Sequence, residues 1–172
     1  MNIHPLFVHF PIGILTLYFL LEVSRLAIIT RKQFYFEFKA VLVVIGTVSI
    51  YLAVATGDMA EELIHSGENS VIGANLLPLV EQHSLYAGAT ITIFSIIAAS
   101  YLFEYCKKFG WLSRVTKIQL FVSLSKLIQK YSVLLAVIGM VFMIITGSLG
   151  ASLVYGPEID PIVTFMYTLF VQ

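Results

Sequence analysis

Two long stretches without a charged side chain limit the fold of this chain more than any other feature of its sequence. They are residues 84–103 and 131–155, and two further apolar stretches begin near residues 7 and 40. A helix needs about 20 mostly apolar residues to cross a hydrocarbon core about 30 Å thick. None of these stretches has the alternation of a β-barrel strand, and lipid requires every backbone polar group to be satisfied within the segment. With their extensions, the predicted helical spans are 7–30, 40–65, 78–106 and 131–155, in one transmembrane four-helix domain covering residues 1–172.

The composition supports an integral membrane protein and excludes several other classes. The chain is 59% hydrophobic and 12% charged, whereas soluble domains are about 45–50% apolar and about 25% charged. A formal net charge of zero gives no basic field for nucleic acid. The single cysteine, Cys106, excludes a disulfide framework and a cysteine-ligated metal site. The start of the chain lacks the basic region of a signal peptide, so we expect the first apolar segment to stay in the mature protein.

The positions of the basic residues predict an orientation in the membrane. All ten Lys and Arg residues lie within residues 25–39 or 107–130, which are the connections between spans one and two and between spans three and four. By the positive-inside rule, both connections face the cytoplasm and both termini face outward. Near the end of span one, Glu22 and Arg25 have the i,i+3 spacing that lets them pair on one helix face.

The connections between the spans have different characters. Residues 106–130 carry apolar side chains at near-helical spacing with lysines among them. This pattern predicts an amphipathic helix on the inner membrane surface, or a cytoplasmic extension of span four. The outer connection, 58–83, is expected to continue span two as a helix, to turn at residues 66–69, and to begin a second helix near Pro78. The tail from Pro161 is too short to span and is expected at the outer interface.

The histidines are the main candidates for chemistry. Under this topology all of them lie near the outer face: His4, His9, His65 and His83. Imidazole binds iron, copper or zinc, and ionisable residues near a membrane interior are functional candidates. We expect Pro11 to start the first helix, with His9 just before it. Gly13, four residues beyond His9, would leave room there for a flat macrocycle.

Four strings of residues occur in an order that resembles one family of bacterial membrane proteins. The strings are HPLFVHFPIG from His4, ATGDMAEELI in span two, LVEQHSLYAG before span three and TGSLGASLVYG at the end of span four. They resemble the DUF2231 family of predicted four-helix proteins, whose function is undefined. Matching strings carry His4, His9, Gly57, Glu61 and His83, and His65 is not part of the pattern. Some members have a histidine where this chain has Ser152.

The resemblance also implies a location and a set of partners. Members of the family sometimes occur alongside haem proteins or cupredoxins, which points to respiratory electron transfer in the bacterial cytoplasmic membrane. The implied partners, besides membrane lipid, are a c-type cytochrome, a cupredoxin or a larger respiratory complex on the outer side.

The first functional hypothesis is an electron carrier with one or two haem b groups. Four-helix bundles hold cofactors with side chains from facing helices, and two axial histidines favour electron transfer. His9 and His83 are the predicted axial ligands, with Gly13 making room for the ring. His4 and His65 would hold a second haem or orient propionates. This hypothesis favours an electron carrier, or a subunit of a larger complex, over a stand-alone enzyme.

Two alternatives remain open from the sequence. The first is a non-haem zinc or copper site, because Glu62 and His65 have the Glu-x-x-His spacing of metal-binding bundles, with Glu61 beside them and Glu81 near His83. The second is a structural subunit without a cofactor, because the small residues in 147–152 permit close approach of another helix.

Overall fold

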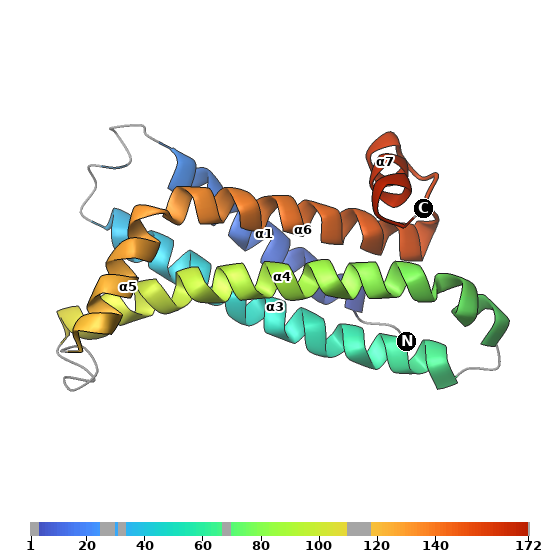
Figure 1. Cartoon of the computed structure of the whole chain (residues 1–172), viewed down its shortest axis with the longest axis horizontal. Coiled ribbons are helices and arrows are strands. Elements are labelled where there is room, and N and C mark those ends of the chain that lie inside the picture. The colour runs from blue at the N-terminus through green and yellow to red at the C-terminus, as the bar shows by residue number, and fades with distance from the viewer. Residues whose placement is uncertain (1–3, 25–29, 31–33, 67–69, 110–117, 172) are drawn as a thin grey trace.

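The computed structural model of the chain describes residues 4–24, 30, 34–66, 70–109 and 118–171, without the side chains of 4–6, 59–66 and 70–75. The described part is helical, and its helices are α1 (His4–Val23), α3 (Tyr35–Ser66), α4 (Ser70–Lys108), α5 (Gln119–Lys130), α6 (Ser132–Tyr155) and α7 (Pro161–Phe170). The four long helices α1, α3, α4 and α6 run side by side, with α5 and α7 at opposite ends of the bundle (Figure 1). The prediction of an all-α fold is confirmed.

Each of the four long helices packs against two others, and the largest apolar cluster lies between them. α1 lies beside α3, α3 beside α4, α4 beside α6, and α6 beside α1. The most buried side chains come from facing helices, among them Leu15, Tyr18, Val43 and Phe94, each of which has no exposed surface. The ring of Tyr18 meets that of Phe94 edge to face, with centroids 6.4 Å apart, a favoured aromatic geometry. Contacts of this kind connect the diagonal helices α1 and α4.

Three helices in the described part are long and apolar enough to cross a membrane. They contribute the stretches Tyr35–Asp58, Leu76–Lys108 and Ser132–Tyr155, whereas the apolar part of α1, Phe7–Val23, is shorter. At 1.5 Å per residue, α3 and α4, with 32 and 39 residues, are about 48 and 58 Å long, so both exceed a hydrocarbon core of about 30 Å. Span four was predicted as 131–155, in agreement with α6.

The first helix differs from its prediction at both ends. It ends at Val23 instead of reaching residue 30, and Ser24 is not helical. Its beginning is at His4, so Pro11 lies inside the helix and the expectation that Pro11 starts it is wrong. Pro5 already occupies the first turn, where a missing N–H costs nothing. Pro11 removes only one further backbone hydrogen bond, so the apolar run continues through it.

Pro78 shows the same deviation in α4. The helix starts at Ser70, so Pro78 lies inside it and the prediction of a helix start there is wrong. The predicted extension of span two to residue 65 is confirmed, because α3 continues to Ser66. Of the predicted turn at 66–69, residues 67–69 lie outside the described part of the chain.

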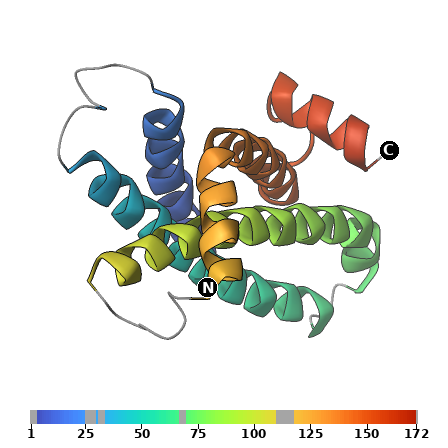
Figure 2. The same ribbon diagram turned by 60° about the vertical axis from the view of Figure 1, so that its left-hand side comes forward.

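The two short helices close the ends of the bundle. α5 is the predicted helix between spans three and four, and Figure 2 shows it set across one end of the bundle. Its buried Ser125 faces the bundle, while Leu120, Leu124 and Leu127 are exposed. α7 begins after Asp160, whose side chain accepts hydrogen bonds from the first free N–H groups of the helix. Such a cap fixes where a helix begins.

Candidate functional site

His83 lies in the contact between α4 and α6. Its Nδ1 is 3.0 Å from the carbonyl oxygen of Thr146, and its ring packs against Gly150, where an added Cβ would lie 3.1 Å from Cε1. Thr146 and Gly150 are one turn apart on the same face of α6. The side chain is therefore held in one direction by a hydrogen bond and a close contact on a neighbouring helix.

The surroundings of His83 are apolar and aromatic. One turn further along α4, Tyr86 contacts the rings of Phe142 in α6 and Phe170 in α7, with centroids 5.8 and 5.0 Å apart. Phe142 and Phe170 pack with the buried Leu149 in the same apolar cluster. At 1.5 Å per residue, Thr146 and Gly150 lie about 14 and 8 Å before the end of α6. His83 thus sits in the half of the bundle that lies toward α7.

His9 and Gly13 lie on the exposed side of α1 and point away from the core. His9 is exposed, and at about 100° per residue it is about 120° around α1 from the buried Leu15. Gly13 is also exposed, and an added Cβ there would meet nothing within 4 Å. Sequence analysis missed these directions because it placed His9 before the helix. The two predicted axial ligands therefore face different surroundings: a helix contact for His83 and the outer surface for His9.

The remaining predicted ligands are only partly described. His4 belongs to α1, and Glu61, Glu62 and His65 belong to α3, but their side chains lie outside the described part. Glu81 is described and exposed. Among the residues whose side chains are described, no three His, Cys, Asp or Glu lie close enough together to hold a metal ion. Ser152 is buried and donates to the carbonyl of Ser148 at 3.1 Å, and it lies about 200° around α6 from Gly150.

A buried ion pair at the end of the bundle near α5 was not predicted. Glu22 of α1 accepts a hydrogen bond from Lys39 of α3 at 2.8 Å, from Tyr101 of α4 at 2.9 Å and from Ser132 of α6 at 2.6 Å. One carboxylate thereby joins all four long helices. The i,i+3 pairing expected for Glu22 concerned Arg25, which lies outside the described residues. The signal available in the sequence was a carboxylate ending one span and a lysine opening the next, at the same membrane depth.

Further polar contacts extend this layer toward α5. Ser125 donates to Glu104 at 3.0 Å, and Gln129 donates to Ser100 at 2.9 Å. Both donors belong to α5 and both acceptors to α4. α5 therefore turns its polar side to the bundle and leaves apolar side chains exposed, as expected for a helix at a membrane interface.

Together, the apolar spans, the buried polar layer and the exposed apolar surface define a helical membrane protein. The family comparison agrees with this class and makes it more specific. Residues 1–160 match the model of DUF2231, described as a predicted membrane protein, and the chain belongs to that family. No curated protein and no solved structure matches the chain.

Proposed function

We propose that this protein is an electron carrier of the bacterial cytoplasmic membrane that binds haem b near the outer face. The observation that carries the proposal is the hydrogen bond between Nδ1 of His83 and the carbonyl of Thr146. A carbonyl oxygen only accepts, so Nδ1 carries the proton, and in the neutral form of the imidazole Nε2 would carry the lone pair. Histidines that bind metals are commonly oriented in this way, by a carbonyl at the other nitrogen.

We take the aromatic cluster one helical turn from His83 as support for a macrocyclic ligand. The neighbouring side chains Tyr86, Phe142 and Phe170 offer apolar ring faces. A bound haem b would supply a one-electron couple, and the chain would contribute an axial ligand and an apolar wall. His9 is the second axial ligand in this proposal. Because His9 is exposed, its role as a ligand is tested by a variant of its own.

The topology in the proposal has four spans, with both termini outside. α1 has 20 residues, which at 1.5 Å each reach about 30 Å, one hydrocarbon thickness. The segregation of all ten cationic residues within 25–39 and 107–130 supports the orientation. A c-type cytochrome or cupredoxin at the outer side would then exchange electrons with the haem.

The test is the absorption spectrum of the purified protein, oxidised and reduced. We expect a Soret band and a sharp reduced α-band, both lost in His83→Ala. Glu81→Gln, an exposed change on the same helix two residues away, is the matched control and should keep the spectrum. His9→Ala reports on the second ligand separately.

Several results would overturn the proposal. A colourless protein with bound zinc or copper would favour the non-haem site at Glu62 and His65. A colourless, metal-free protein would favour a structural subunit. A full Soret band in both His9→Ala and His83→Ala would show that the predicted pair is wrong, and His4 with His65 would be the next pair to replace.

A further inference from the structure

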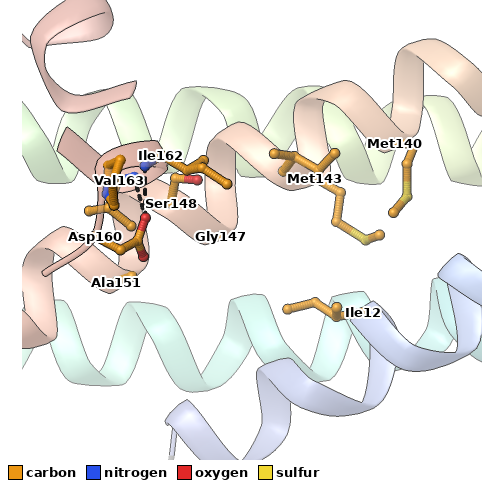
Figure 3. Close-up of a pocket in the computed structure, with 11 residues that line it drawn as sticks. Ile12, Met140, Met143, Gly147, Ser148, Ala151, Asp160, Ile162 and Val163 are labelled. Atoms are coloured by element: carbon orange, nitrogen blue, oxygen red, sulfur yellow. Dashed lines mark hydrogen bonds between the residues drawn. The ribbon is translucent and has the colours of Figure 1, made fainter. Parts of the chain in front are cut away.

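A groove opens on the outer half of the bundle, between α1, α6 and the beginning of α7 (Figure 3). Its volume is about 590 Å³, within the range of about 300–1,000 Å³ typical of small-molecule sites. It is separate from His83, which contacts a different face of α6. The lining residues are Ile12, Met140, Met143, Ile144, Gly147, Ser148, Ala151, Asp160, Pro161, Ile162 and Val163.

Small side chains leave room for the groove between α1 and α6. At the inner end, Ser132 of α6 donates to Glu22 of α1 at 2.6 Å. In the outer half, Gly147 is exposed, and an added Cβ there would meet nothing within 4 Å. Gly46 differs, because its added Cβ would lie 2.5 Å from the side chain of Leu15. Gly46 permits close helix packing, whereas the small size of Gly147 leaves open space.

The groove is apolar along its length and acidic at its outer end. Figure 3 shows Asp160 and Ala151 at one end and Met140 at the other. Between residues 140 and 151, α6 rises by about 16 Å, which is about half of the 30 Å hydrocarbon core. Its length therefore fits a single leaflet.

The negative charge at the outer end of the groove favours some lipid head groups over others. Asp160 and Glu158 are both exposed, and every Lys and Arg of the chain lies elsewhere, within residues 25–39 or 107–130. Oδ1 of Asp160 accepts hydrogen bonds from Ile162 and Val163. A head group carrying an ammonium is attracted here, and a purely anionic one is repelled.

We propose that the groove binds one outer-leaflet phospholipid with an ammonium head group, such as phosphatidylethanolamine. One acyl chain lies between Ile12 and Gly147, and the ammonium lies against Asp160. The lipid fills the outer gap between α1 and α6 that no side chain of the described residues fills.

The experiment is native mass spectrometry of the protein in mild detergent, supplied with equal amounts of phosphatidylethanolamine and phosphatidylglycerol. One ion pair at an exposed carboxylate predicts roughly two- to fivefold more of the ethanolamine lipid retained. Asp160→Asn should bring this ratio to about one, because Asn still caps α7 but carries no charge. Ala151→Leu should lower retention of both lipids, and Ala99→Leu, an exposed position on α4 outside the groove, should not.

Three outcomes would contradict the proposed lipid site, and each points to a different error. Equal retention of both lipids, unchanged by Asp160→Asn, would refute the head-group assignment. A retained quinone in place of phospholipid would show another occupant. A dimer that Ala151→Leu dissociates would show that a second copy, and not a lipid, covers the groove.

Discussion

Neutralising Glu22 should destabilise the bundle more than any change at an exposed ion pair. The side chains of Glu22 and Lys39 are 4% and 12% exposed, so Glu22→Gln leaves the Lys39 ammonium buried without its carboxylate. Removing one partner of a buried ion pair costs about 3–5 kcal/mol. Gln keeps the shape of the side chain, but it has a single acceptor oxygen, whereas Tyr101 and Ser132 donate to different oxygens of Glu22. It can therefore still accept from one of the two hydroxyls. We therefore expect a loss within that range.

Removing the side chain should cost still more. Glu22→Ala also takes away the acceptor of Tyr101 at 2.9 Å and of Ser132 at 2.6 Å. Hydrogen bonds between membrane helices contribute about 0.6 kcal/mol on average and at most about 1.7 kcal/mol. Because Gln keeps one acceptor oxygen, Glu22→Ala loses one further bond and should add about 0.6–1.7 kcal/mol beyond Glu22→Gln. The assay is unfolding in mixed micelles with increasing dodecyl sulfate, followed by helical circular dichroism.

A matched control and a double variant make the result specific. Lys107 pairs with Glu104 at 3.3 Å but is 42% exposed, so Lys107→Gln should cost about 1 kcal/mol or less. Glu22→Leu combined with Lys39→Met removes both charges and should recover much of the stability lost by Glu22→Leu alone. If Glu22→Gln unfolds like Lys107→Gln, the inference that the buried pair stabilises the bundle is refuted.

Three further changes test other parts of the structure. Gly46→Leu should destabilise the protein by about 1–3 kcal/mol in the same assay, because the added side chain overlaps Leu15; wild-type stability would contradict this close packing. Gly150→Leu should displace His83, whose Cε1 is 3.1 Å from the position of the new Cβ, and should lower haem content without removing a ligand; a full Soret band would contradict it. A membrane-impermeant thiol reagent added outside intact cells should not label Cys106, and ready labelling would reverse the proposed topology.

Length and hydropathy predicted the long helices well, while prolines predicted their ends poorly. α6 begins and ends within one residue of its prediction, because an uncharged run has few alternatives in lipid. Pro11 and Pro78 were expected to start helices, yet both lie inside them. One missing hydrogen bond costs less than ending an apolar helix and leaving its terminal backbone groups without partners. Whether a helix starts at a proline or continues through it therefore depends on the neighbouring residues and not on the proline alone.

The functional residues were harder to predict, because their directions depend on tertiary contacts. Local spacing paired Glu22 with Arg25, but Lys39 of the antiparallel neighbour is the partner that the structure describes. Sequence analysis also treated His9 and His83 as equivalent. Once α1 begins at His4, helical geometry directs His9 outward, while Thr146 holds His83 in a helix contact.

The two ends of the bundle differ in a way that bears on function. At the end near α5, which is the inner end in the proposed topology, a single carboxylate joins all four long helices, so opening that end would break a buried ion pair and two hydrogen bonds. At the opposite end, which is the outer end in that topology, the groove at Gly147 lies between α1 and α6. A ligand that enters from lipid at the outer end disturbs none of the contacts of Glu22. The same closed inner end would hold the helices in place while the outer end exchanges its ligand, which is why we assign binding to the outer half of this protein.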